Sequence, residues 1–190
     1  MVGSMGTVYE TIDDALRGWI ERQPMFFVAT AALAADATVN LSPKGTDGTL
    51  AVLDAQRVAY LDLTGSGIET VAHLRENGRI TLMWCAFEGP PRIVRIQGRG
   101  HVVGPDDDEW ESLLGHFHPH RGARAMVVVS ATRIFDSCGY SVPRMEFVAQ
   151  RSTLDDWTER RSDDELDDYR RTRNATSIDG LPGLPGLPTQ

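Results

Sequence analysis

The chain has 190 residues, of which 41% are hydrophobic, and carries a formal net charge of −8 at pH 7. This length and composition allow one domain with a well-filled core, or one domain with an appendage. The excess of negative charge disfavours nucleic acids and anionic membranes as main partners, so an anionic ligand requires a local cationic pocket.

The cysteines and the apolar runs indicate where the protein resides. Cys85 and Cys138 are the only cysteines, and such sparse usage is typical of a reducing compartment rather than of a disulfide framework. No apolar run approaches the length of a membrane-spanning helix, and no apolar segment follows a basic start. We therefore expect a cytoplasmic protein without a membrane partner. Residues 1–9 are interpreted as a leader, whose first four residues resemble a vector-derived remnant.

The N-terminal part of the chain predicts one helix and a β-hairpin. Apolar residues recur at helical spacing over residues 11–23, where Thr11 is the expected cap. Residues 25–33 and 38–42 are interpreted as paired strands. The sequence Pro43-Lys44-Gly45 is expected to break the second strand, as proline does at an edge or an irregularity. Lys44 is the only lysine of the chain, and this position makes it a candidate ligand contact.

The organising stretch of the sequence is a predicted strand at residues 57–64, a glycine-bearing turn and a helix at residues 68–77. Gly65 and Gly67 allow the backbone to turn sharply and to approach a ligand closely. The first N–H groups of a helix lack intrahelical partners and carry partial positive charge, so such a terminus can hold a phosphate. Three hydroxyl groups surround the turn, those of Thr64, Ser66 and Thr70.

A second interpretation of the same turn is purely structural. Ser66 and Glu69 stand at the S-x-x-E spacing of a capping box, which would use the free N–H groups internally. From spacing alone the capping box is the favoured interpretation. Neither G-x-G-x-x-G nor G-x-x-x-x-G-K-[ST] occurs, so the sequence contains no dinucleotide-binding fingerprint and no nucleoside-triphosphate loop.

The middle of the chain predicts more strands. Residues 79–87 form an apolar run that suits a central strand, and residues 92–103 alternate between an apolar and a polar face. The polar face is a candidate groove or subunit contact and holds Arg95, Gln97, Arg99 and His101. Residues 105–115 predict a helix with an acidic first turn, residues 125–135 a strand, and residues 145–148 a last short strand.

The C-terminal part predicts surface structure. Residues 151–178 alternate charges around sparse apolar anchors, which indicates one or two surface helices. Residues 179–190 repeat Gly-Leu-Pro and are expected to form a flexible tail outside the core. The six or seven strands, joined mainly by antiparallel hairpins, favour an α+β barrel with peripheral helices.

Three segments together resemble the pyridoxamine 5′-phosphate oxidase-like superfamily. They are Asn40-Leu41-Ser42-Pro43-Lys44-Gly45, residues 63–82 and residues 92–98. The resemblance is closer to a bacterial branch that carries N-[LV]-S-P-K-G, T-G-S-G-x-E-T and C-G-[YF]-x-V-P motifs. It covers residues 10–150, and the order and spacing of the motifs are more specific than any one of them.

The resemblance implies an antiparallel split β-barrel that binds FMN at a homodimer interface. The segment beside the flavin ring and ribityl chain would be Ser42, Pro43, Lys44 and Gly45. The phosphate-binding turn would comprise Thr64, Gly65, Ser66, Gly67, Glu69 and Thr70. The loop at residues 138–143 would lie near a site, in the same subunit or its partner.

The sequence departs from pyridoxamine 5′-phosphate oxidase itself, after which the superfamily is named, at two positions. The oxidase's phosphate-binding Arg-Lys pair aligns with Glu69-Thr70, and a flavin-contacting glutamine aligns with Ile93. A carboxylate beside a dianion is unfavourable, so we expect Glu69 to turn back as a cap. Lys44 or Arg95 would then supply the missing positive charge. These departures argue against true pyridoxamine phosphate oxidase activity and leave FMN binding as the expectation.

A histidine cluster and one cysteine offer competing chemistry. Three imidazoles alternate at His116, His118 and His120 and could bind a transition metal, although a solvated loop is the favoured interpretation and no metal is expected. Cys138 is either a redox thiol or a small hydrophobic residue. The sequence identifies no catalytic residue. The favoured function is a flavin-dependent oxidoreductase acting on a small molecule, and the alternatives are a non-catalytic flavin-binding or electron-carrier protein and, more weakly, a metal-binding protein.

Overall fold

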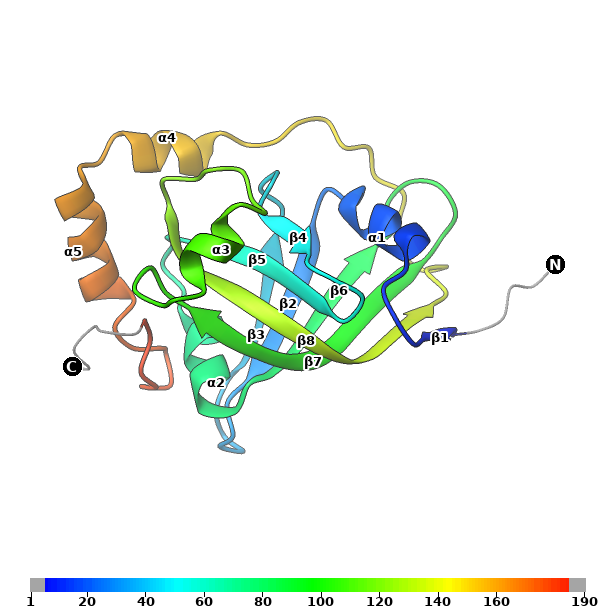
Figure 1. The fold of residues 1–190 in the computed structure, drawn as a ribbon, viewed down its shortest axis with the longest axis horizontal. Coiled ribbons are helices and arrows are strands. Elements are labelled where there is room, and N and C mark those ends of the chain that lie inside the picture. The colour runs from blue at the N-terminus through cyan, green and yellow to red at the C-terminus, as the bar shows by residue number, and fades with distance from the viewer. Residues whose placement is uncertain (1–5, 185–190) are drawn as a thin grey trace.

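The computed structural model describes residues 6–184, which form one antiparallel sheet with helices around it (Figure 1). The sheet has eight strands, in the order β3-β2-β6-β7-β8-β5-β4, with β1 paired to β8. The strands are β1 (Val8–Tyr9), β2 (Phe26–Ala31), β3 (Val39–Lys44), β4 (Leu50–Val52), β5 (Arg57–Leu63), β6 (Arg79–Cys85), β7 (Ile93–Val103) and β8 (Ala123–Ser137). The helices are α1 (Asp14–Glu21), α2 (Glu69–Asn77), α3 (Trp110–Leu114), α4 (Thr153–Glu159) and α5 (Asp163–Arg173).

The sheet curls around its buried face without closing. Strands β3 and β4 stand at opposite ends of the strand order, and within residues 6–184 no ladder of hydrogen bonds joins them. The architecture is therefore an antiparallel split β-barrel with peripheral helices, which confirms the α+β fold predicted from the sequence. None of the helices in this part of the chain combines the length and the apolarity that crossing a bilayer requires.

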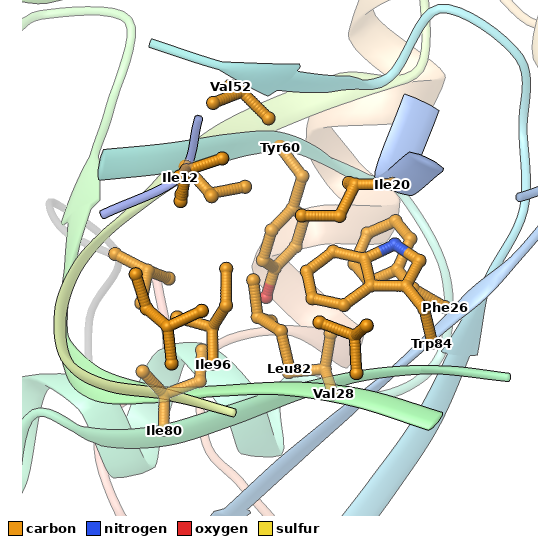
Figure 2. Packing of buried hydrophobic residues seen from close by; sticks show 14 of the residues in the cluster. Ile12, Ile20, Phe26, Val28, Val52, Tyr60, Ile80, Leu82, Trp84 and Ile96 are labelled. Carbon is orange, nitrogen blue, oxygen red and sulfur yellow. The ribbon is translucent and has the colours of Figure 1, made fainter. Parts of the chain in front are cut away.

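The interior of the barrel is filled by aromatic and branched aliphatic side chains (Figure 2). The ring of Phe26 lies 5.5 Å from that of Tyr60 and 5.7 Å from that of Trp84, measured between centroids. Helix α1 adds Leu16 and Ile20 to this core, and both are buried. Burying such a side chain contributes about 1.5–3 kcal/mol, so the barrel interior is the main source of stability.

Strand β3 runs further than the sequence predicts. The expected break at Pro43-Lys44-Gly45 is wrong, because Phe27 pairs with Pro43 and Phe26 with Lys44. Proline is tolerated in this strand because β3 lies at the edge of the sheet, where the missing N–H removes no bond to a second neighbour. Lys44 is therefore the last residue of β3 and lies beside the opening in the barrel.

Three other local predictions are wrong. Helix α1 is capped by Asp13, whose carboxylate accepts from the N–H of Leu16 at 2.8 Å, rather than by Thr11. The helix predicted at residues 105–115 shortens to α3, because the carboxylate of Asp107 instead accepts from the N–H of Gly104 at 2.6 Å and closes a turn. Residues 145–148 form no strand and lie within an irregular connection between β8 and α4.

The C-terminal part is folded against the barrel further than expected. Helix α5 begins with a capping box between Ser162 and Glu165. The prediction of a flexible tail at residues 179–190 is wrong for residues 179–184, since Leu184 is only 7% exposed and packs against Ile68 and Val71. Leu184 is thus an apolar anchor that packs at the start of α2. Residues 185–190 and 1–5 lie outside the described part of the chain.

Candidate functional site

A polar cleft of about 260 Å³ opens at the split between β3 and the strands opposite it. Strand β3 contributes Asn40, Ser42, Pro43 and Lys44 to it, and β5 and β8 contribute Asp62, Leu63 and Arg124. The rest of the lining is the turn after β5 and the start of α2, namely Gly65, Gly67, Ile68, Glu69 and Thr70. The cleft therefore gathers two segments that the sequence analysis singled out from distant positions.

An ion triad around a buried carboxylate lies in the wall of this cleft. Asp62 is 1% exposed, and its carboxylate accepts from Lys44 Nζ at 2.9 Å and from Arg124 Nε at 2.8 Å. Burial alone would raise the pKa of Asp62, but the two neighbouring cations and their hydrogen bonds outweigh it and hold the pKa below its ordinary value. The triad thus keeps two positive side chains fixed at the cleft by one ionised carboxylate.

Arg124 also fixes the turn that the sequence marked as a phosphate site. Its Nη1 donates to the carbonyl of Gly65 at 3.0 Å and its Nη2 to that of Gly67 at 2.6 Å. Neither Arg124 nor Asp62 was predicted from the sequence as a site residue. The available signal was chemical, because a carboxylate inside a nearly continuous apolar strand requires a cation, and Arg124 is the basic residue preceding the apolar run of β8.

The N-terminus of α2 has no capping box. Ser66 is exposed and caps nothing, and the N-cap position is Ile68, which has no side chain able to accept a hydrogen bond. The structural interpretation of the S-x-x-E spacing is therefore wrong. Glu69 turns back as expected, with Oε2 accepting from the N–H of Ile68 at 3.0 Å. Within residues 6–184, the backbone N–H groups of Glu69, Thr70 and Val71 have no acceptor.

A chain of polar side chains extends from the cleft wall into the protein. Asn40 Nδ2 donates to Thr70 Oγ1 at 2.9 Å and to Thr30 Oγ1 at 3.1 Å, and Asn40 Oδ1 accepts from Ser42 Oγ at 2.9 Å. Thr30 in turn contacts Nδ1 of the fully buried His73 at 3.0 Å. These bonds fix the side chains on the β3 wall opposite the α2 terminus.

Four predicted site residues lie away from the cleft surface. Thr64 is buried and donates to the carbonyl of Gly122 at 2.9 Å, so it anchors the turn from behind. Ser66 points to solvent, and Gly45 lines a separate hollow of about 580 Å³ beside α1. Arg95 lies on the outer face of β7, where Nη1 donates to Ser137 Oγ at 2.9 Å. Within one chain, Arg95 is therefore not the positive charge of the cleft.

The three histidines of the predicted alternative do not converge. His118 Nδ1 lies 3.8 Å from the carboxylate of Asp47, and His120 Nε2 lies 2.7 Å from that of Asp155. Over the described residues, no three histidine, cysteine, aspartate or glutamate side chains are close enough to hold a metal ion. Cys138 is exposed, and Cys85 is buried, which raises the pKa of its thiol.

Comparison with known proteins places the chain in a family. The family model for pyridoxamine 5′-phosphate oxidase matches residues 12–138. The chain is 37% identical over 196 residues to the pyridoxamine 5′-phosphate oxidase family protein ustO of Aspergillus flavus, with 94% of this chain and 78% of that protein covered.

Solved structures agree with this at the level of the fold. A histidine-to-alanine variant of the HupZ protein of Group A Streptococcus superposes with a TM-score of 0.51 at 20% identity, covering 66% of this chain and 98% of HupZ. Another HupZ structure gives a TM-score of 0.50 at 19% identity, with 65% and 91% of the two chains covered. The family model and the sequence match show that this chain belongs to the pyridoxamine 5′-phosphate oxidase family.

Proposed function

We propose that this protein binds FMN with its phosphate at the N-terminus of α2, and that it acts as a homodimeric flavin-dependent oxidoreductase on a small molecule. The observation that carries the proposal is the set of free donors around one cleft. Three backbone N–H groups at the start of α2 lack acceptors within residues 6–184. A helix terminus of this kind favours an anion.

The side chains of the cleft offer the remaining donors. Lys44 gives one of its three N–H groups to Asp62, and Arg124 gives three of its five to Asp62, Gly65 and Gly67. Within residues 6–184, two donors therefore remain on each side chain. Lys44 from β3 and Arg124 from β8 would thus replace the Arg-Lys pair of the oxidase, which aligns with Glu69 and Thr70 in this chain and is missing here. This arrangement favours Arg124 over Arg95 as the second positive charge.

The volume of the cleft suggests which part of FMN it would hold. Pockets that enclose a whole small ligand measure about 300–1,000 Å³, whereas this cleft measures about 260 Å³. The phosphate and part of the ribityl chain would fit inside, with the ring extending along the edge of β3. The ring would then need a second surface to cover it.

The outer face of the sheet is a suitable surface for that partner. In β3 the polar residues face the cleft, while Val39 and Leu41 point outward and are 76% and 63% exposed. The register of β2, β6 and β7 continues this face, which we define as Phe27, Ala29, Ala31, Val39, Leu41, Pro43, Thr81, Met83, Arg95, Gln97 and Arg99. This outer face is apolar on β3 and β2 and cationic on β7. We take such a face to favour an interface between two copies.

The chemistry would come from the cofactor, and the chain would supply binding and orientation. FMN transfers hydrides and electrons between a reduced donor and an acceptor. The Lys44–Asp62–Arg124 triad would fix the phosphate end, and Asn40 and Ser42 would offer hydrogen bonds along the β3 wall. Residues of the outer face from a second copy would exclude water from the ring.

Two measurements test this function in sequence. The purified protein should show flavin absorbance, or it should quench FMN fluorescence when FMN is added at micromolar concentration; a failure of both would overturn the proposal. Anaerobic mixing of the loaded protein with NADH or NADPH, followed by an acceptor, should give repeated turnover. Binding without turnover with any donor would favour the non-catalytic flavin carrier instead.

A further inference from the structure

We infer that the C-terminal segment contributes to phosphate binding, because it positions the turn and the helix terminus that would hold the anion. We call residues 170–184 the C-terminal strap. It follows the body of α5 and returns to the end of the barrel where α2 lies (Figure 1). The inference rests on the proposed function for the identity of the ligand.

The strap holds the turn through a fully buried side chain. Asn174 is 0% exposed, and its Nδ2 donates to the carbonyl of Gly65 at 2.9 Å. The same carbonyl accepts from Arg124 at 3.0 Å. One backbone oxygen of the turn is therefore fixed from two sides, once by the barrel and once by the strap. Arg170 Nε donates to Thr64 Oγ1 at 3.1 Å, immediately before the turn.

The strap also controls the carboxylate nearest to the proposed phosphate. The N–H of Ile178 donates to Glu69 Oε1 at 3.3 Å, while Oε2 accepts from the N–H of Ile68. Both oxygens of Glu69 are thus directed to backbone donors. The adjacent Asp179 accepts from the N–H and the hydroxyl of Thr38 at 3.0 and 2.6 Å, which ties the strap to the start of β3. A released strap would free Glu69 to repel an anion at the start of α2.

The end of the strap is held against the barrel by close packing. Leu184 packs in a cluster with Ile68, Val71 and Ala125 beside the start of α2. A Cβ atom on Gly183 would lie 2.0 Å from the carbonyl oxygen of Asn174 and 2.9 Å from Ile68 Cγ1. Only glycine fits this crossing, so we expect Gly183→Ala to displace the strap from the barrel, and Ile68 is the cleft residue whose side chain the new Cβ would meet.

The test compares two strap variants with a matched control on the same segment. Asn174→Ala removes the bond to Gly65, and Gly183→Ala disturbs the docking. Arg171→Ala is the control, since its side chain is 53% exposed and pairs only with Asp168 on its own helix within the described residues. Affinities for FMN and for riboflavin, which lacks the phosphate, are measured by flavin fluorescence on the full-length proteins.

We expect Asn174→Ala and Gly183→Ala to weaken FMN by about three- to tenfold and riboflavin by less than twofold, because the strap acts on the phosphate end. Arg171→Ala should leave both affinities unchanged. Wild-type affinity for FMN in both strap variants would overturn the inference while leaving the proposed function intact. Equal losses for both flavins would also overturn it, since they would indicate a general structural effect.

A second readout separates failure of the inference from failure of the proposed function. Amide hydrogen exchange of residues 65–72, measured without ligand, should be faster in Asn174→Ala than in wild type and unchanged in Arg171→Ala. If wild type bound neither flavin but this exchange difference appeared, the proposed cofactor would be wrong and the positioning role of the strap would stand. Identical exchange in all three proteins would overturn the positioning role.

Discussion

At the scale of single residues, the molecule keeps several polar groups in apolar surroundings, and in the described part of the chain only some of them have hydrogen-bond partners. Asp62 is neutralised by Lys44 and Arg124, so its burial is compensated. Tyr60 is also fully buried, yet within residues 6–184 its hydroxyl has no hydrogen-bond partner. Figure 2 shows its ring in the barrel among Ile20, Leu82 and Phe26. Asp62 and Tyr60 both lie on β5, but we expect removal of their polar groups to have opposite effects on stability.

Tyr60→Phe should leave the free energy of unfolding unchanged or raise it by about 1 kcal/mol, because it removes a buried group without removing a hydrogen bond. Tyr9→Phe is the control, since the Tyr9 hydroxyl accepts from Arg92 Nη2 at 2.6 Å and also contacts Asp136. Tyr9→Phe should lower stability by about 1 kcal/mol. Urea unfolding measures both. A larger loss for Tyr60→Phe than for Tyr9→Phe would contradict this account of the core.

The Asp62 triad predicts an acid limit to stability. The pKa of Asp62 in the folded protein is below the ordinary value of 3.8, so its contribution is fully present above that value. It is lost as the pH falls through the lower folded pKa, where the unfolded chain takes up the proton first. Resistance to urea unfolding should therefore weaken steadily below about pH 4.

Asp62→Asn tests the same triad directly. It leaves the buried Arg124 and the partly exposed Lys44 without their counter-charge and should lower stability at pH 7 by about 3–5 kcal/mol. The remaining acid dependence should then be shallower than in wild type. A variant with unchanged stability at pH 7 would show that the triad does not hold the cleft together.

At the scale of elements, the sequence predicted the elements that local chemistry determines. The turn after β5 and helix α2 were found because the glycines of the turn are a local signal. Asn40 and Ser42 were placed on one strand, whereas Lys44 was placed in a break after it, although β3 includes Lys44. The break at Pro43 was wrong because an edge position tolerates proline, and position in the sheet is not a local property.

The missed residues depended on distant contacts. Arg124 meets Asp62 across 62 residues of sequence, and Asn174 meets Gly65 across 109. The position of Asp62 in an apolar strand indicates only that a cation must meet it, and a single sequence contains no local signal that identifies the partner in either pair. The capping box at Ser66 was wrong for the opposite reason, since its spacing is correct but Glu69 reaches the backbone of Ile68 instead. Leu184 was missed because a Gly-Leu-Pro repeat shows no periodic apolar face.

The two helix starts give a direct comparison of capping. Asp13→Ala should lower stability by about 1 kcal/mol, because it removes the side-chain acceptor from α1. Ser66→Ala should change stability by less than half of that, because Ser66 caps nothing at α2. Thermal unfolding of the two variants measures the difference. A larger loss of stability for Ser66→Ala than for Asp13→Ala would indicate a capping box at α2 and would contradict the structure.

At the scale of the whole molecule, the split barrel has two unequal faces around its opening. The inner side of β3 is polar and belongs to the cleft, and the outer side is apolar and belongs to the outer face. A strand in a monomer normally has the reverse arrangement. Both sides of β3 gain a function if a second copy covers the outer face and completes the flavin site.

Light scattering should therefore report a dimer, and Leu41→Asp should shift it toward monomer because a charge would be buried at the interface. Val148→Asp is the control, since Val148 is 89% exposed but lies in the irregular connection after β8. A monomer at all concentrations in wild type would contradict the homodimer. An unchanged dimer in Leu41→Asp would place the interface on another surface.

The most direct test of the central claim is the affinity of Lys44→Ala for FMN and for riboflavin. A hydrogen bond to a charged group contributes about 1.5–3 kcal/mol, and each 1.4 kcal/mol is about tenfold in affinity. If Lys44 contacts the phosphate at the start of α2, FMN binding should weaken by roughly ten- to a hundredfold, and riboflavin binding should change much less. Equal losses for the two flavins, or no loss for either, would contradict a phosphate site built on Lys44, Arg124 and the N-terminus of α2.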